Sequence, residues 1–271
     1  MLIAAERRSE WLPGCCRQPK AVGTLYIKIM AKDDERRDQL PADRKSSAVE
    51  AFLREVRAMP AVRPASGRGR LIFALDATAS REATWDRACR LQGEMFETAA
   101  GLGGLDVQLV FYRGFDECKA SRWLDTAAAL HRAMRGVSCV GGETQIGRVL
   151  AHALKEARGE KVNALVFVGD AMEEKVDALS RLAGELGLLG VPVFIFHEGG
   201  DQTAGLAFRQ IAKLSGGAYC PFDAASADQL RQLLGAVAAY AAGGRGALAL
   251  YGRRVGGAAL LLAGAVDGAK T

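Results

Sequence analysis

The sequence has few of the residues from which catalytic and metal sites are most often built. Only three of its 271 residues are histidine, and none of them has a partner at the spacing of a metal site or a catalytic pair. The six cysteines form neither a Cys-x-x-Cys pair nor a Cys/His cluster, so no zinc site or redox motif is indicated. We expect these cysteines to be scattered thiols in a reducing cytoplasm.

Long hydrophobic runs are also missing. The longest charge-free stretches include Gln232–Gly244 and Val255–Val266, and both are well short of the roughly 20 residues that span a bilayer. The apolar start of the chain, residues 1–5, is followed at once by charged residues, which is not the pattern of a secretory signal. We therefore expect a cytoplasmic protein with no membrane partner.

The net charge is +5 and the pI is near 8.9, values that often accompany binding to nucleic acid. The basic excess, however, lies in residues 1–70, which hold 15 Lys and Arg against 9 Asp and Glu; the rest of the chain holds 21 against 22. A nearly neutral domain predicts no nucleic-acid partner. Residues 1–45 lack helical or strand periodicity and are interpreted as a disordered tail. Because Met30 begins a second plausible start, we interpret residues 1–29 as an over-extended translation start.

From residue 71 onward, short runs rich in Val, Ile, Leu and Phe alternate with longer stretches at helical spacing. This pattern predicts an α/β fold: a doubly wound, mostly parallel sheet with helices on both faces. The segment Glu117–Trp123 predicts one antiparallel edge strand, because a tight turn separates it from the preceding strand. The other expected strands are Leu71–Asp76, Val107–Tyr112, Leu165–Val168, Val191–Phe196 and Ala218–Phe222. The expected helices are Trp85–Ala100, Leu124–Met134, Ile146–Ala157, Lys175–Leu189, Leu206–Leu214 and Ala227–Ala242.

The main domain is predicted to span residues 68–244. Before it, residues 46–67 are expected to form an amphipathic helix over Ser46–Met59, followed by a linker rich in Pro, Gly and Arg. After it, residues 245–271 are assigned to a C-terminal tail. Within that tail the Gly/Ala/Leu-rich stretch Arg245–Val266 is compatible with either a short packed helix or a frayed end.

Polar side chains follow three predicted elements at the edge where ligands bind in open α/β sheets, outside the carboxyl ends of the strands. Asp76, Thr78 and Ser80 follow the first strand at alternate positions, so three hard oxygen donors can converge on one point. Thr144 lies in a glycine-rich turn ahead of a helix, and Asp170 ends a buried strand. Carboxylates and hydroxyls of this kind suit a hard divalent cation, with Mg²⁺ the first expectation. The simple alternative is that Asp76 and Ser80 only cap the following helix.

This constellation resembles the metal-ion-dependent adhesion site of von Willebrand factor A domains, whose signature is Asp-x-Ser-x-Ser, a later Thr and a later Asp. Thr78 stands where the family usually has Ser, and Asp170 lies in Gly-Asp-Ala where Thr-Asp-Gly is commoner. The resemblance implies direct or nearly direct metal contacts from Asp76, Thr78 and Ser80, with Thr144 acting directly or through water and Asp170 acting through water.

The same resemblance implies a non-enzymatic module for binding proteins. Its cation, Mg²⁺ with Mn²⁺ or Ca²⁺ as alternatives, would keep an open position that an Asp or Glu of a partner protein completes. In bacteria, stand-alone domains of this family often work beside chaperone or AAA-type ATPase machinery, so such machinery is the partner class that the resemblance implies.

Two enzyme classes compete with this interpretation. The placement of Asp76 and Asp170 at strand ends also resembles that in the haloacid-dehalogenase phosphatases. In that family a second aspartate acts as the general acid, but here Thr78 takes its place, and a threonine hydroxyl is a poor proton donor near neutral pH. A dinucleotide-binding site is disfavoured because the turn after the first strand contains no glycine. A metal-dependent phosphatase remains the alternative function.

Overall fold

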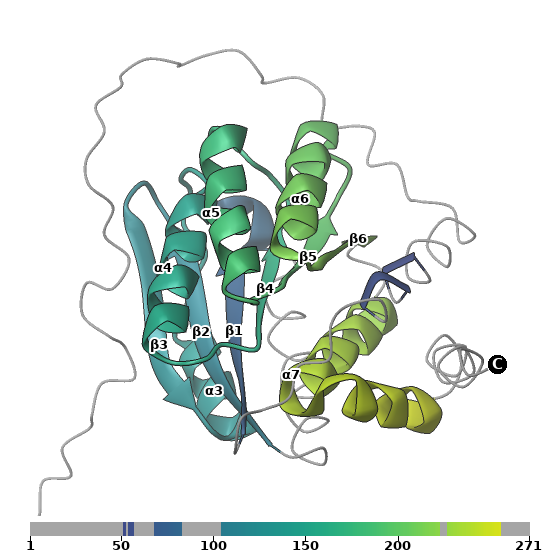
Figure 1. Ribbon diagram of the computed structural model, residues 1–271. Coiled ribbons are helices and arrows are strands. Elements are labelled where there is room, and N and C mark those ends of the chain that lie inside the picture. The colour runs from purple at the N-terminus through teal and green to yellow at the C-terminus, as the bar shows by residue number, and fades with distance from the viewer. Residues whose placement is uncertain (1–50, 53, 57–67, 83–103, 223–226, 256–271) are drawn as a thin grey trace, which may run out of the picture.

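The computed structural model describes residues 51–52, 54–56, 68–82, 104–222 and 227–255. These residues form a six-stranded sheet with helices on both faces (Figure 1). The strands are β1 (Gly69–Asp76), β2 (Leu105–Arg113), β3 (Glu117–Leu124), β4 (Ala164–Gly169), β5 (Val193–Glu198) and β6 (Ala218–Phe222). The helices are the 3₁₀ helix η1 (Ala79–Arg81) and the α-helices α3 (Ala127–Arg135), α4 (Ile146–Gly159), α5 (Val176–Leu188), α6 (Gln202–Ser215) and α7 (Ala227–Val255).

The strand order is β3-β2-β1-β4-β5-β6. All neighbouring pairs are parallel except β2 with β3, which is antiparallel. This confirms the predicted doubly wound sheet with one antiparallel edge. From β1 the chain continues to β2 and β3 toward one edge of the sheet, and from β4 it continues to β5 and β6 toward the other edge. The crevice between the carboxyl ends of β1 and β4 is the place where such sheets bind ligands.

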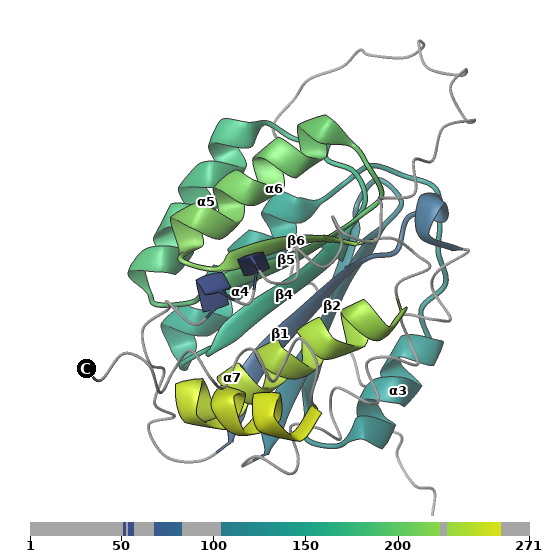
Figure 2. The same ribbon diagram turned by 90° about the vertical axis from the view of Figure 1, so that its right-hand side faces the viewer.

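Both faces of the sheet are buried. Alternate residues of β1 point to opposite faces: Phe73 belongs to one hydrophobic cluster and Ile72 to the other. Helices α3 and α7 cover the first face, and α4, α5 and α6 cover the second (Figure 2). Two-sided burial explains why β4 and the middle of β1 and β5 are continuous apolar runs without polar alternation.

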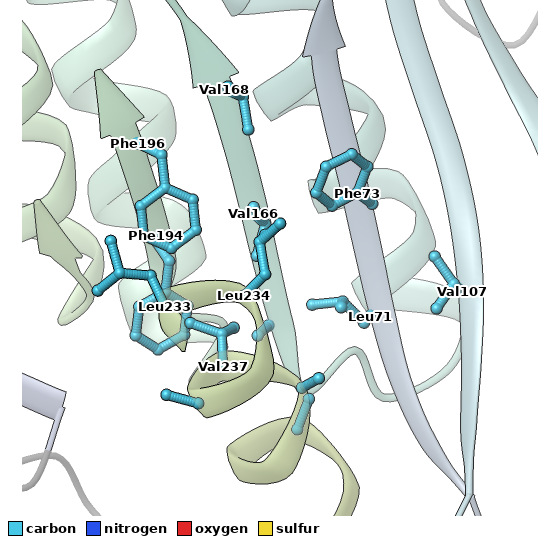
Figure 3. Packing of buried hydrophobic residues seen from close by; sticks show 14 of the residues in the cluster. Leu71, Phe73, Val107, Val166, Val168, Phe194, Phe196, Leu233, Leu234 and Val237 are labelled. Atoms are coloured by element: carbon cyan, nitrogen blue, oxygen red, sulfur yellow. The ribbon is translucent and has the colours of Figure 1, made fainter. Parts of the chain in front are cut away.

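Helix α7 supplies much of the first layer. Its residues Leu233, Leu234 and Val237 face the apolar side chains of the central strands (Figure 3). The predicted helix end at Ala242 is a kink, where Gly243 and Gly244 have non-helical backbone angles. The chain is helical again as far as Val255, so the described part of the Arg245–Val266 stretch is a packed helix. None of the described helices is long and apolar enough to cross a membrane.

Several predicted elements begin or end at other residues in the structure. The helix predicted from Leu124 begins at Ala127, because Leu124 ends β3 and the side chain of Thr126 caps the helix. Helix α6 begins at Gln202 rather than Leu206, because the side chain of Asp201 accepts a hydrogen bond from Ala204 N at 2.8 Å and caps an earlier turn. Within the predicted helix Ser46–Met59, the described residues 51, 52 and 54–56 are helical. Phe52 is fully buried there, with its ring 5.4 Å from that of Phe196. The predicted helix Trp85–Ala100 lies outside the described residues.

Gly69 is required by the close approach of α7 to the start of β1. A Cβ at this position would lie 2.1 Å from the carbonyl oxygen of Ala241. We expect Gly69→Ala to lower the free energy of unfolding by about 1–3 kcal/mol, the usual cost of overpacking, as measured by urea denaturation. The matched control is Gly184→Ala in α5, where a Cβ meets nothing within 4 Å and a gain of about 0.5–1 kcal/mol is expected. Equal effects of the two substitutions would contradict this role of Gly69.

Candidate metal centre

The last residue of β1, Asp76, carries a fully buried carboxylate. Its Oδ1 accepts a hydrogen bond from Thr78 N and its Oδ2 accepts one from the hydroxyl of Tyr112, both at 2.8 Å. Asp76 and Tyr112 are register partners at the ends of the parallel strands β1 and β2, which explains how the tyrosine reaches the carboxylate. Burial raises the pKa of Asp76, although these hydrogen bonds oppose the shift.

The two hydroxyls that follow Asp76 lie together. Thr78 Oγ1 and Ser80 Oγ are 3.1 Å apart, and η1 holds them there because Arg81 N donates to the carbonyl oxygen of Thr78. Thr78 precedes η1, but its side chain makes no capping hydrogen bond. The hydroxyl of Thr78 is therefore directed to Ser80 rather than to the backbone of the helix.

Thr144 is joined to the loop that follows β4. Its amide donates to the carboxylate of Glu173 and its hydroxyl accepts from Glu173 N, both at 3.0 Å. Asp170 begins that same loop. The reciprocal pair of hydrogen bonds therefore fixes Thr144 to the loop in which Asp170 lies.

Asp170 lies at the end of β4, the parallel neighbour of β1. Its Oδ1 is buried and has no hydrogen-bond partner among the described residues. Its charge contributes to the raised pKa of Asp76, after the larger effect of burial. Two carboxylates thus stand close to each other at neighbouring strand ends, and one of their buried oxygens lacks a donor.

These donors fit a hard cation in type, since carboxylate and hydroxyl oxygens are what Mg²⁺ prefers. The orphaned Oδ1 of Asp170 is the atom that a cation would satisfy. The described part of the chain contains no group of three or more His, Cys, Asp or Glu side chains that could hold a metal ion. A cation at this edge would therefore depend on the hydroxyls of Thr78, Ser80 and Thr144 as well as on the two carboxylates.

Helix α4 is capped from a distance by Glu174. Its own N-cap residue, Gln145, makes no capping hydrogen bond with its side chain. Instead the carboxylate of Glu174 accepts hydrogen bonds from the amides of Ile146 and Gly147, the second at 2.9 Å. A carboxylate at a helix N-terminus satisfies free amides and complements the helix dipole. The β4–α5 loop is thereby fixed to the start of α4.

A buried ion pair near the site was not predicted from the sequence. Arg81, the last residue of η1, pairs with Glu198 at the end of β5, and their side chains are 3% and 11% exposed. Burial lowers the pKa of Arg81, while the charges of Asp170 and Asp76 oppose that shift. The guanidinium is therefore a positive charge that acts on both candidate carboxylates.

Comparison with solved structures identifies this architecture. A von Willebrand factor type A protein from Catenulispora acidiphila matches with a TM-score of 0.54 and 18% identity, over 64% of this chain and 43% of its own. The SpRpn10 VWA domain matches with a TM-score of 0.50 and 13% identity, over 60% of this chain and 94% of its own. The fold is that of a von Willebrand factor A domain.

A third structure with this von Willebrand factor A fold is the pilus adhesin SpaC from Lactobacillus rhamnosus GG. It matches with a TM-score of 0.52 and 10% identity, over 71% of this chain and 31% of the adhesin. The chain thus spans less than half the length of the Catenulispora protein and of the adhesin. No family model and no curated protein matches the sequence. These similarities establish the A-domain fold. Support for a metal site comes from the residues of this chain.

The cap of α4 gives a test of the local architecture. We expect Glu174→Ala to lower the free energy of unfolding by about 1–2 kcal/mol, because two amides of α4 lose their acceptor. The measurement is chemical denaturation at pH 7. Glu173→Ala is the matched control, since this exposed neighbour accepts from one amide only. The cap assignment would be wrong if Glu173→Ala cost as much as Glu174→Ala.

His197, at the end of β5, supports the backbone of Asp170. Its Nε2 lies 3.3 Å from the carbonyl oxygen of Asp170, and its Nδ1 lies 2.9 Å from the hydroxyl of Tyr219. Because a carbonyl oxygen only accepts, Nε2 carries a proton, and in the neutral ring Nδ1 accepts from the hydroxyl of Tyr219. Burial lowers the pKa of His197 and so favours this neutral form.

This lowered pKa predicts a pH dependence of stability. The unfolded chain binds a proton near the ordinary histidine pKa of about 6.5, whereas the folded state resists it. The contribution of the neutral His197 to the free energy of unfolding is therefore complete above about pH 6.5. It is lost as the pH falls toward the lower pKa of the folded state. We expect the unfolding free energy of the wild type to fall between pH 7.5 and pH 5, and His197→Gln to flatten this slope. His131→Gln, at an exposed position, should keep it; a flattened slope in this control would overturn the assignment.

Proposed function

We propose that the chain is a non-enzymatic module that binds another protein through a divalent cation. Mg²⁺ is the first candidate, with Mn²⁺ or Ca²⁺ as alternatives. Asp76, Thr78 and Ser80 would hold the cation, with Thr144 and Asp170 completing the protein's share. An Asp or Glu of the partner would fill the open position. The observation that carries this proposal is the buried Oδ1 of Asp170, without a donor and close to the carboxylate of Asp76.

The charge of the surrounding edge supports a role for a cation. The described loops at this edge, residues 77–82, 114–116, 136–145, 170–175 and 199–201, hold seven carboxylates and two basic side chains. The carboxylates are those of Glu82, Asp116, Glu143, Asp170, Glu173, Glu174 and Asp201, and the basic residues are Arg81 and Lys175. Without a cation this edge repels an acidic partner. A bound dication reverses the local sign, so that attraction to a partner carboxylate depends on metal.

The nearby side chains favour binding over catalysis. Thr78 stands where a phosphatase of the haloacid-dehalogenase type has its general acid, and a threonine hydroxyl is a poor proton donor near neutral pH. Burial raises the pKa of the Cys139 thiol to about 11, so this thiol stays protonated and is a weak nucleophile at neutral pH. The similarity in fold to a pilus adhesin is consistent with a binding role. Chaperone or AAA-type ATPase machinery remains the partner class that we propose.

Metal binding is tested with Mn²⁺ as the probe, followed by electron paramagnetic resonance. We expect the wild type to bind one Mn²⁺ and Asp76→Ala to weaken binding at least about tenfold, the effect of losing a charged ligand. Asp170→Ala should weaken binding less if its contact runs through water. Asp116→Ala is the matched control, because this carboxylate is on the same edge but its side chain is 90% exposed and paired with Arg148. Equal losses in Asp76→Ala and Asp116→Ala would contradict the site.

The binding function is tested by affinity capture with and without EDTA, repeated with Asp76→Ala. A partner that depends on the cation is lost in EDTA and in the variant, and it returns when Mg²⁺ is restored. Retention of the same partners under all conditions would rule out the proposed mechanism. Hydrolysis of para-nitrophenyl phosphate by the wild type, abolished in Asp76→Ala, would instead establish the phosphatase alternative.

A further inference from the structure

The ion pair between Arg81 and Glu198 extends across the candidate site. Arg81 follows β1 and Glu198 ends β5, but β4 lies between these two strands. Neighbouring strands are about 4.8 Å apart, so β1 and β5 are separated by roughly 10 Å. To reach Glu198, the side chain of Arg81 must pass over the carboxyl end of β4, where Asp170 begins. The guanidinium therefore lies at the carboxyl edge of β4 and β5, where the charges of Asp170 and Asp76 act on it.

The burial of this pair makes its charges strong. Both side chains are almost fully buried, and arginine stays protonated under all ordinary conditions. In such surroundings, water screens a charge much less than it does on the surface. Arg81 consequently acts as a resident cation that neutralises part of the negative charge of Asp76 and Asp170. The attraction of both carboxylates for Arg81 agrees with this placement.

We propose that the Arg81–Glu198 ion pair sets the affinity of the site for a divalent cation, an inference that rests on the metal dependence in the proposed function. An entering cation and the guanidinium carry like charges and share the same two carboxylates, so each weakens the binding of the other. Glu198 opposes this competition because it holds the guanidinium on the β5 side of the crevice. The residues thus have opposite effects: Arg81 weakens cation binding and Glu198 strengthens it.

The test measures Mn²⁺ affinity by electron paramagnetic resonance in purified full-length variants. We expect Arg81→Met to bind Mn²⁺ about tenfold more tightly than the wild type, and Glu198→Gln to bind it about tenfold more weakly, the scale of one neighbouring charge in a partly buried site. The opposite signs matter, because general damage to the fold would weaken binding in both. Arg158→Met is the matched control, since Arg158 pairs with Glu185 on helices α4 and α5 with its side chain 63% exposed; its affinity should equal that of the wild type.

Removing one member of a buried ion pair can prevent folding. The double variant Arg81→Met/Glu198→Gln leaves no unpaired charge and completes a double-mutant cycle for Mn²⁺ affinity. Loss of Arg81 should tighten Mn²⁺ binding in this background too, relative to Glu198→Gln alone. The inference is overturned if loss of Arg81 leaves affinity unchanged or weaker in the folded variants. If the wild type binds Mn²⁺ and Asp76→Ala does not, such a result at Arg81 overturns this inference alone and leaves the proposed function in place. If neither the wild type nor Arg81→Met binds Mn²⁺, the proposed function fails as well.

Discussion

The buried carboxylate of Asp76 is the constraint around which the ligand edge of this protein is organised. A carboxylate without access to water is costly unless hydrogen bonds or opposite charge stabilise it. Here the amide of Thr78 and the hydroxyl of Tyr112 each donate to one of its oxygens. The parallel register of β1 and β2 makes the second contact possible, because it sets Tyr112 directly opposite Asp76. The strand pairing of the sheet therefore determines which side chains stabilise the carboxylate of Asp76.

The loops around Asp76 are held by side chains that cross from one segment to another. Glu173 and Glu174 follow β4, yet they bind the backbone at the start of α4. Arg81 follows β1 and reaches Glu198 on β5. Each cross-link takes the place of a local interaction, such as the missing side-chain cap of α4. As a result, the described loop after β4 is fixed to the start of α4, and η1 is fixed to the end of β5, which would preorganise the oxygen donors for a small cation.

Much of the fold was predictable from the sequence because its signals are local. Two-sided burial makes continuous apolar strands, and the alternate oxygen donors at Asp76, Thr78 and Ser80 are visible without coordinates. Asp201 shows where such signals fail: it caps α6, but an acidic residue after two glycines is also typical of a loop. The predicted end of α7 at Ala242 was wrong for a different reason. Gly243 and Gly244 form a kink, and the helix continues after it.

The supporting residues of the site were not predictable for a different reason. Tyr112 lies near the end of β2 and has the pattern of a core side chain, and only the strand pairing reveals its contact with Asp76. Glu173 and Glu174 precede α5 in the sequence, yet they accept hydrogen bonds from backbone amides at the start of α4. Arg81 and Glu198 are far apart in sequence and meet only because β4 lies between β1 and β5. Such long-range partners depend on the topology, which periodicity alone does not specify.

Stability alone does not account for a charged group at position 76. An asparagine there could accept from Thr78 N with its oxygen and donate to Tyr112 with its amide, so it would keep both hydrogen bonds without burying a charge. Burial raises the pKa of Asp76, which means that the fold opposes the ionised form. The additional property of the aspartate is its negative charge, placed beside the unpartnered oxygen of Asp170. A charge that the fold opposes and a cation would stabilise is the pattern of a functional site, and it is the reason to seek the function of this protein at this edge.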